Sequence, residues 1–282
     1  MKFVDNDHLA GLILEYIMAC DYIYESEINL ENVVDWLKLS SGVNSIAIDT
    51  TKYDHSLTYC GHALDYENAR SKLMSSLTTE LVRFHFVWGA LESLVAEFVP
   101  QADVERFGKI NALCDYLKKS CLEGLLPKGY REGYSRFVEL MREISQYKND
   151  LDAINITRSK QSKKRHIDIA GIGVYSVYKV RNKFAHGSME FPEPDGYGEG
   201  AEFNKELIIF ATRIVLMTII MLFISDIKNN NAAMTLDNFR FIKSFKFDSY
   251  EYSLTSQLDE PGFDVHKVTA VRYLQHLCLD KA

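Results

Sequence analysis

The pattern of apolar and polar residues along the chain predicts a mainly all-α protein. Apolar residues recur at the three- and four-residue spacing that places them on one face of an amphipathic helix. In the first such segment, Leu9, Ile13 and Ile17 share a face. The spacing predicts amphipathic helices over residues 7–24, 30–39, 65–98, 102–122, 130–148 and 265–279.

The most hydrophobic stretch, residues 205–226, has two interpretations. Its length approaches that of a membrane-spanning helix. However, Arg213 lies near its start, where a charge would be costly in lipid, and no aromatic belt flanks it. We therefore expect a helix that is buried on all sides, in the core or at a dimer interface. Membrane association is the alternative.

Two regions depart from the helical pattern. Residues 45–49 alternate in the manner of a short strand, and residues 239–247 alternate aromatic with basic or polar side chains. Residues 250–254 are placed to form the second strand of a hairpin with 239–247. Aromatic and basic side chains in alternation can stack on RNA bases. A half-buried edge hairpin explains the same pattern and is the favoured interpretation.

An asparagine-rich segment that begins at Asn229 marks a boundary near the end of the chain. We divide the sequence into a mostly helical accessory segment at 1–64, a helical domain at 65–228 and an extension at 229–282. The extension holds the predicted β-hairpin and the last helix. The complete fold class is thus a helical bundle with an N-terminal helical extension and a small C-terminal hairpin plus helix.

The composition indicates a reduced, cytoplasmic protein. The chain has 282 residues, of which 47% are hydrophobic, so it can bury a sizeable core. Its five cysteines are widely scattered and lack zinc-ligand spacing, which is typical of reduced thiols. The first residues lack the pattern of a signal peptide. We therefore expect a cytoplasmic location and no bound metal.

Positive charge is concentrated in one region, although the whole chain carries a net charge of −7. Residues 158–183 contain eight basic residues and a single acid, Asp168. Any attraction to nucleic acid must therefore be local. Residues 149–167 lack helical periodicity, and we expect them to form an exposed basic loop. Such a loop could guide an RNA backbone, or it could simply be solvated.

This basic region ends in a motif that combines Arg181, Asn182 and His186 with a helix stop. Residues 175–187 are typical of the last turns of a helix. Gly187 occupies the position where a left-handed glycine commonly ends a helix. The sequence therefore predicts that the motif lies at a helix C-terminus.

Helical geometry separates the side chains of the motif helix into two stripes. The polar stripe contains Tyr175, Lys179, Asn182 and His186. The apolar stripe, which should face the core, contains Gly173, Val177, Val180 and Phe184. Arg181 lies at the border of the apolar stripe, roughly 140° around the helix and about 7.5 Å along it from His186. One chain cannot easily place both side chains on one phosphate, whereas two copies related by a two-fold axis could.

The string Arg181-x4-His186, with Asn182 after the arginine and Ala-His-Gly at the helix stop, resembles the signature of the HEPN family. The long apolar helix that follows also matches that family. The resemblance covers residues 65–228 and implies a dimeric helical domain. It implies a metal-independent endoribonuclease, often a bacterial toxin or an antiphage defence protein, without a cofactor. The partners it implies are RNA, a second copy of the chain and an antitoxin or defence-system protein.

The resemblance implies that Arg181 and His186 form the catalytic pair. In RNA cleavage by the ribose 2′-hydroxyl, a histidine transfers a proton and an arginine stabilises the phosphate charge. Asn182, one turn before the histidine, could orient the imidazole or hold a phosphate oxygen. We assign RNA or phosphate binding to Lys179, Lys183 and Tyr175.

The same residues are also compatible with other interpretations. Arg181 could pair with an acidic residue while His186 only complements the helix dipole. Glu92, in a segment similar in style to the opening helix of HEPN domains, could reach the motif helix or be solvated. The whole domain could also be a non-catalytic dimeric module that binds RNA, a nucleotide or a protein partner.

Overall fold

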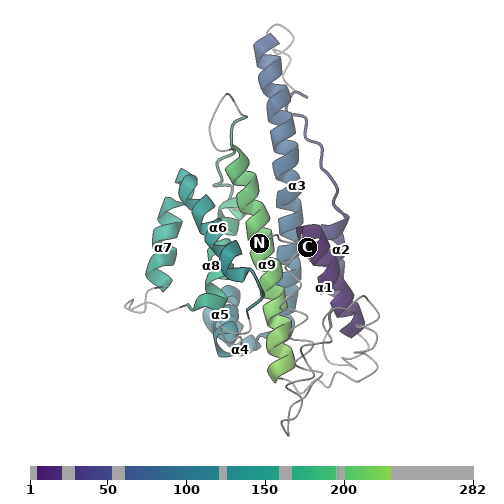
Figure 1. Ribbon diagram of the computed structural model, residues 1–282, viewed down its shortest axis with the longest axis vertical. Helices are drawn as coiled ribbons and strands as arrows, with labels where there is room; N and C mark the ends of the chain where they lie inside the picture. The colour runs from purple at the N-terminus through teal and green to yellow at the C-terminus, as the bar shows by residue number, and fades with distance from the viewer. Residues whose placement is uncertain are drawn as a thin grey trace, which may run out of the picture.

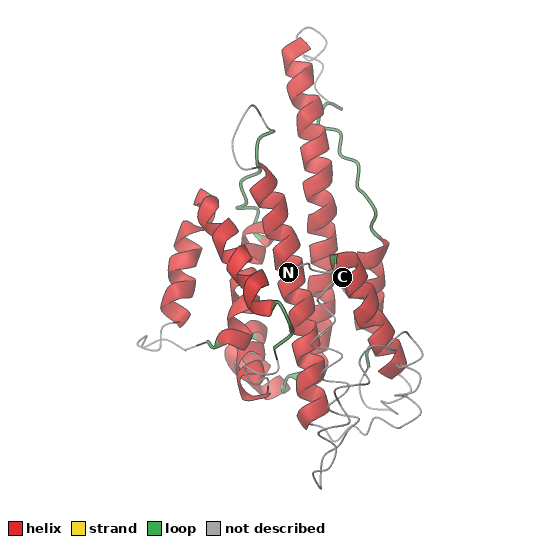
Figure 2. Ribbon diagram, in the orientation of Figure 1, coloured by secondary structure: helices red, strands yellow, loops and turns green. Residues whose placement is uncertain are grey.

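The computed structural model describes residues 5–20, 29–52, 61–120, 126–158, 167–194, 196 and 201–229. Helices dominate these residues, and no strand occurs among them (Figure 2). The α-helices are α1 (Asn6–Cys20), α2 (Glu31–Gly42), α3 (Gly61–Phe98), α4 (Gln101–Phe107), α5 (Lys109–Ser120), α6 (Tyr130–Glu143), α7 (Lys148–Arg158), α8 (Ile169–Ala185) and α9 (Ala201–Asn229). A short 3-10 helix, η3 (Ser145–Tyr147), precedes α7. The prediction of an all-α protein is confirmed for this part of the chain.

The two longest helices, α3 and α9, form the centre of the molecule (Figure 1). Helices α1 and α2 pack on one side of this pair, and α5 to α8 pack on the other. All of them contribute to one continuous hydrophobic core. The predicted division between residues 64 and 65 falls in the first turn of α3.

Helix α9 is buried on every side, as its composition predicts. Every residue from 211 to 226 is buried, and Leu216, Ile220 and Phe223 are fully inaccessible to solvent. The helix is long and apolar enough to cross a membrane, but 89% of its apolar window is buried inside the protein. Such burial is that of a helix in the core of a protein.

The predicted helix at 102–122 is wrong as a single element. Gly108 has a positive φ of 79° with ψ of 151°, and this residue separates α4 from α5. A positive φ is readily adopted only by glycine, so the chain can turn sharply here. The amphipathic spacing continues across the break, and spacing alone does not reveal it.

The boundary between α6 and the basic region also differs from expectation. The predicted helix at 130–148 stops at Glu143, where Ile144 becomes extended. Residues 149–158, which we expected to belong to the exposed loop at 149–167, form α7 together with Lys148 instead. Leu151 and Ile154 of α7 are buried in the core. These two apolar residues stabilise a helix that is too short and too polar elsewhere to give a clear pattern.

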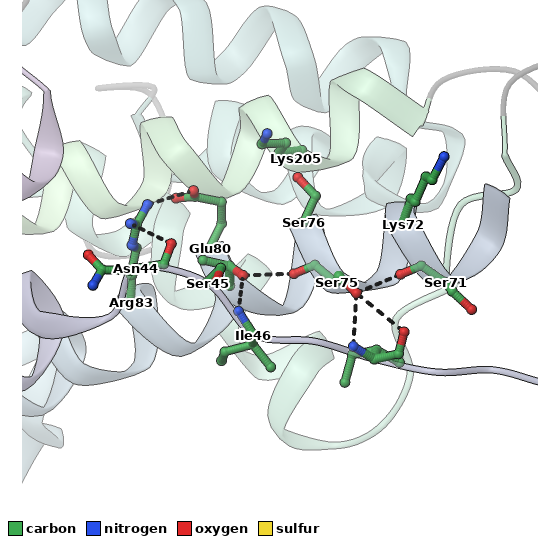
Figure 3. A pocket seen from close by; sticks show the side chains of 12 residues that line it. Asn44, Ser45, Ile46, Ser71, Lys72, Ser75, Ser76, Glu80, Arg83 and Lys205 are labelled. Carbon is green, nitrogen blue, oxygen red and sulfur yellow. Dashed lines mark hydrogen bonds and ion pairs between the residues drawn. The ribbon is translucent and has the colours of Figure 1, made fainter. Parts of the chain in front are cut away.

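The predicted strand at 45–49 is wrong, although the segment is extended. Its backbone N–H groups bond to hydroxyls on α3 rather than to another strand (Figure 3). Ile46 donates to Thr79 Oγ1 at 2.9 Å, Ile48 to Ser75 Oγ at 2.8 Å and Thr50 to Ser71 Oγ at 3.0 Å. We call these three hydroxyl residues, Ser71, Ser75 and Thr79, the hydroxyl ladder.

The hydroxyl ladder can form because the repeat distance of the extended segment nearly equals that of one turn of α3. Two residues of extended chain advance about 6.6 Å, and four residues of α-helix advance about 6 Å. Alternate N–H groups of the extended segment therefore meet every fourth side chain of α3. The Ser75 and Thr79 hydroxyls also donate to the carbonyls of Ser71 and Ser75 one turn back, at 2.7 and 2.8 Å. These bonds orient each hydroxyl oxygen as an acceptor.

Helix α8 carries the motif and is fixed at both ends. Asp168 caps its N-terminus by accepting N–H bonds from Ala170 and Gly171. Near this end, Gly173 allows the Tyr130 hydroxyl to approach the helix backbone, where it donates to Ala170 O at 3.1 Å and accepts from Gly173 N at 3.2 Å. Gly187 is left-handed, with φ of 63°, so the predicted glycine stop is confirmed.

The remaining predictions concern residues outside the described part of the chain. These are residues 21–24 of the first predicted helix, 121–122 of the helix predicted at 102–122, most of the basic run at 159–166, the hairpin at 239–254 and the helix at 265–279.

Candidate functional site

His186 occupies the C-cap of α8 and is exposed to solvent. Its backbone N–H donates to Asn182 O at 3.0 Å. The next two N–H groups, of Gly187 and Ser188, donate to Phe184 O at 3.2 Å and Lys183 O at 2.9 Å. This is the Schellman arrangement, in which a left-handed glycine lets the chain fold back and satisfy the last carbonyls. The backbone around His186 is therefore fixed, while its imidazole faces solvent.

Arg181 lies against the core rather than beside His186. Its guanidinium carbon is 5.8 Å from the centre of the Trp88 ring on α3, a cation–π distance. Trp88 is only 2% exposed and donates its indole N–H to Glu92 Oε1 at 2.7 Å. Tyr178, one turn before Arg181, stacks on the same indole with centroids 6.5 Å apart. The arginine is thus oriented by an aromatic surface that is itself held in place.

Arg181 makes no ion pair with any of the described residues. This observation disfavours the alternative in which an acid neutralises the arginine. Glu92, which we expected to reach the motif helix or remain solvated, contacts Trp88 and forms a 3.9 Å ion pair with Lys109. It acts on the motif helix only through the indole.

Lys183 is engaged within the protein. Its ammonium lies 3.4 Å from Asp150 Oδ2 of α7 and 5.6 Å from the centre of the Tyr147 ring. Burial, together with the nearby Asp150 charge, raises the pKa of the Tyr147 phenol. A phosphate would have to displace Asp150 in order to bind Lys183.

Lys179 and Tyr175 form a separate pair on the polar stripe. The Lys179 ammonium lies 5.4 Å from the centre of the Tyr175 ring, and both side chains are partly exposed. Asn182 and His186 continue the stripe toward the helix end, as the sequence predicts. On the other stripe, Val177 and Val180 are fully buried, and the side chain of Phe184 meets Phe84 with ring centroids 6.1 Å apart.

The structure therefore sorts the six predicted site residues into groups. His186, Asn182, Lys179 and Tyr175 share the accessible stripe, whereas Arg181 turns toward α3 and Lys183 toward α7. Since helical geometry separates Arg181 from His186 by roughly 140°, one chain presents them on different faces. The supporting residues Trp88, Tyr178 and Asp150 were not singled out from the sequence, because their partners are distant along the chain or carry no motif.

The loop after the motif is tied to two other elements. Gln146 of η3 forms a reciprocal pair with the backbone of Glu190, accepting from its N–H at 3.1 Å and donating to its carbonyl at 3.3 Å. The hydroxyl of Tyr66 on α3 donates to Glu193. These contacts hold residues 188–194 beside the helix end. No sequence pattern indicated them.

A separate groove of about 520 Å³ lies between α3, the extended segment and the start of α9 (Figure 3). Lys72, Ser76 and Glu80 of α3 line it together with Lys205 of α9. Burial raises the pKa of the Glu80 carboxyl, although the neighbouring Arg83 acts in the opposite direction. None of the predicted site residues lines this groove.

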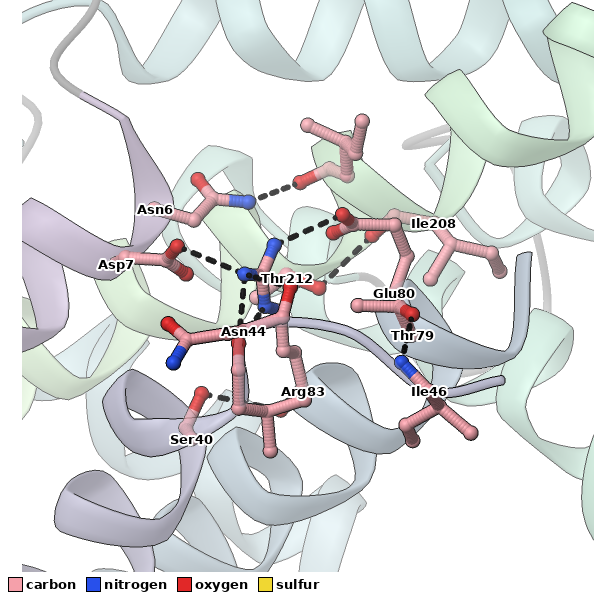
Figure 4. Close-up of polar contacts among 12 residues, drawn as sticks. Asn6, Asp7, Ser40, Asn44, Ile46, Thr79, Glu80, Arg83, Ile208 and Thr212 are labelled. Atoms are coloured by element: carbon pink, nitrogen blue, oxygen red, sulfur yellow. Dashed lines mark hydrogen bonds and ion pairs between the residues drawn. The ribbon is translucent and has the colours of Figure 1, made fainter. Parts of the chain in front are cut away.

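The side chain of Arg83 joins three chain segments at one edge of the groove: α1, the segment after α2, and its own helix α3 (Figure 4). It forms ion pairs with Asp7 Oδ2 at 3.1 Å and Glu80 Oε1 at 3.0 Å, and it donates to Val43 O at 2.9 and 2.7 Å. Nearby, Asn6 donates to Ile209 O of α9 at 2.8 Å. The saturation of Arg83 by carboxylates and carbonyls indicates a structural role.

No group of three or more His, Cys, Asp or Glu side chains is arranged to hold a metal ion in the part of the chain that the structure describes. Compared with protein-family models, curated proteins and solved structures, the chain matches none of them.

Proposed function

We propose that the protein is a metal-independent endoribonuclease of the HEPN type, with a composite Arg181/His186 site at a homodimer interface. The observation that carries this proposal is the environment of the two side chains. Arg181 is oriented on Trp88 without an acidic partner among the described residues, and His186 is exposed at a fixed helix end five residues later. A purely structural arginine and histidine would not need this combination.

The proposed reaction breaks the bond between phosphorus and the 5′ oxygen of the next nucleotide. The ribose 2′-hydroxyl attacks phosphorus, His186 takes or gives the transferred proton, and the products are a 2′,3′-cyclic phosphate and a 5′-hydroxyl. Arg181 stabilises the extra negative charge of the transition state. Asn182 orients the imidazole or holds a phosphate oxygen. Lys179 and Tyr175 bind the RNA backbone, and Lys183 joins them when a phosphate displaces Asp150.

A two-fold axis beside the end of α8 would bring an arginine from one chain to the histidine of the other. Each site of such a dimer contains residues from both chains. The same activity fits a cytoplasmic toxin or antiphage protein, whose RNA cutting an antitoxin or defence-system partner would control.

The test is cleavage of a mixed, labelled RNA pool in the presence of EDTA. We expect wild-type protein to leave 2′,3′-cyclic phosphate ends, and Arg181→Ala or His186→Ala to lose at least about 100-fold in rate. Arg106→Ala and His62→Ala are matched controls, because Arg106 is an exposed arginine over the Phe107 ring and His62 is an exposed histidine. Cutting retained by both motif variants would refute the catalytic assignment.

Mixing the two inactive variants tests the composite site. If each site takes Arg181 from one chain and His186 from the other, a heterodimer of the two variants contains one intact site. Activity should then return to roughly a quarter of the wild-type level after subunit exchange. No recovery, with exchange confirmed by mass, would show that each chain supplies both residues of its own site.

The second candidate is a non-catalytic dimeric module that binds RNA, a nucleotide or a protein. The separation of Arg181 and His186 on one chain favours it. RNA binding by the wild type that Arg181→Ala weakens, without any cleavage, would support this candidate instead.

A further inference from the structure

The extended segment against α3 has a second edge that the fold does not use. In an extended chain, the N–H and C=O of one residue point to the same side, and those of the next residue point to the opposite side. Ile46, Ile48 and Thr50 direct theirs toward the hydroxyl ladder. The backbone groups of Ser45, Ala47 and Asp49 must therefore point away from α3.

These outward groups are accessible. Ser45, Ala47 and Asp49 are all exposed, and their backbone N–H groups bond to none of the described residues. Ile48 beside them is 36% exposed, one of the large apolar side chains left at the surface of the described structure. The segment is thus an open strand edge of the kind to which another strand can add.

Soluble proteins usually protect such edges with lysine, proline or a bulge. Residues 44–50, Asn-Ser-Ile-Ala-Ile-Asp-Thr, contain neither lysine nor proline. Its only charged side chain is Asp49, and the hydroxyl ladder holds the stretch straight. The edge is therefore formed in advance, so a partner strand would not have to order it.

The sequence of the edge is nearly a palindrome about Ala47. Isoleucine flanks the alanine on both sides, and the next positions outward are Ser45 and Asp49. Across a two-fold axis, residue i of one chain meets residue j of the other and residue j meets residue i, so the isoleucines on both sides of Ala47 give two matched apolar pairs.

We propose that this edge pairs antiparallel with the same edge of a second copy of the chain, with the two-fold axis at Ala47. Ala47 faces Ala47 of the second copy, and Ser45 faces Asp49. These are hydrogen-bonded pairs, each of which exchanges both of its N–H···O bonds. Ile46 faces Ile48 in the closer non-hydrogen-bonded pairs, which covers the exposed Ile48 side chain. The Ser45 hydroxyl can donate to the Asp49 carboxylate opposite.

This contact is distinct from the dimer proposed for the ribonuclease site. None of its residues belongs to the motif helix, and it lies against the part of α3 that runs from Ser71 to Thr79. The ribbon is much smaller than a standard protein interface, so association through it should be reversible and dependent on concentration. Together with a dimer at α8, it would join dimers into larger assemblies.

Substitutions at Ser45 test both the pairing and its register in the full-length protein. Ser45→Lys places a cation opposite Asp49, and Ser45→Asp places two acids opposite each other. Because the two-fold axis repeats each contact, the association constant should rise or fall by up to roughly 30-fold. Sedimentation velocity over a concentration series measures this change. Equal association for both variants and the wild type would overturn the proposal.

Ala47→Pro removes the N–H at the two-fold axis without touching a bond to the hydroxyl ladder. We expect it to abolish association through this edge, whereas Ala47→Val, which keeps the N–H, should retain it. Circular dichroism and the RNA-cleavage rate should stay unchanged in both variants. An assembly state that is the same for Ala47→Pro and Ala47→Val would count against the proposal.

A disulfide between two copies locates the axis directly. Residues in a hydrogen-bonded antiparallel pair have Cα atoms about 5.5 Å apart, which lies within the range that a disulfide spans. Under mild oxidation, Ala47→Cys should therefore join two copies through position 47 of each, and peptide mass identifies the link. Leu39→Cys, at a residue that is 50% exposed on α2, is the control. A link that forms no faster at position 47 than at position 39 would overturn the proposal.

Discussion

At the scale of single residues, the tightest contact in the motif helix lies far from the motif. Gly173 packs against Tyr130, and a Cβ at this position would overlap the Tyr130 hydroxyl and lie 3.0 Å from Ile214 Cγ2. Gly173 and Tyr130 are both buried, and the tyrosine is bonded to the helix backbone. This glycine is therefore needed for close packing of α6 and α9 against α8.

We expect Gly173→Ala to lower the free energy of unfolding by about 2–3 kcal/mol, because the overlap exceeds the gain in helix propensity. Gly133→Ala is the matched control, since its Cβ would meet only Arg213 Cδ at an ordinary 3.9 Å. Denaturant unfolding measures both variants. The double variant with Tyr130→Phe should lose less stability than the sum of the single changes. Strict additivity would show that the hydroxyl is not the obstacle.

For some site residues, the sequence alone predicts whether the side chain is buried or exposed. The glycine stop, the exposed His186 and the buried Val177 and Val180 all follow from helical spacing and C-cap preference. The position of Arg181 over Trp88 does not, since these residues lie 93 positions apart in the chain. Arg181 lies at the border of the apolar stripe, and its side chain turns inward because α3 presents the Trp88 ring there.

At the scale of elements, the segment from Ser45 to Thr50 shows how a correct local pattern leads to a wrong assignment. Its alternation predicts an extended chain, and the bonds of Ile46, Ile48 and Thr50 to every fourth residue of α3 require one. A strand, however, is defined by its partner, and here the partner is the hydroxyl ladder on α3. Serine and threonine at every fourth position of a helix are common on solvated faces, so the sequence offered no reason to connect the two segments.

Ser75→Ala should detach the middle of this segment. It removes the oxygen that accepts from the Ile48 N–H. We expect the Ile48 amide to exchange its hydrogen at least about fivefold faster, which corresponds to about 1 kcal/mol for one lost hydrogen bond. Ser76→Ala is the control, because Ser76 has no hydrogen bond to the segment. Equal exchange rates in the two variants would mean that the ladder does not hold the strand edge.

At the scale of the whole molecule, α9 is the element on which most of the other helices depend. It contacts α1, α3, α5, α6 and α8. Its length and hydropathy would also suit a membrane span, but Arg213 disfavours that interpretation, and these neighbours cover the surface of the helix. The continuous core that results includes α1 and α2 as well as the motif helix.

A core position for α9 predicts a large effect of shortening one of its side chains. Ile220 is fully buried, and Ile220→Ala should lower the free energy of unfolding by about 2–5 kcal/mol through lost burial and a cavity. Ile209→Ala, at a partly buried position of the same helix, should cost about 1 kcal/mol. Thermal or urea unfolding of the purified proteins compares them. Similar small losses at both positions would indicate that α9 is not packed on all sides.

The sequence by itself determined the helical class, the burial of α9 and the glycine stop that exposes His186. These features depend on local periodicity, composition and backbone preference, which are properties of short segments. Only the tertiary structure decided the break at Gly108, the folding of α7, the partner of the extended segment and the inward turn of Arg181. Each of these depends on a surface contributed by residues distant in the chain, and a local pattern contains no information about that surface.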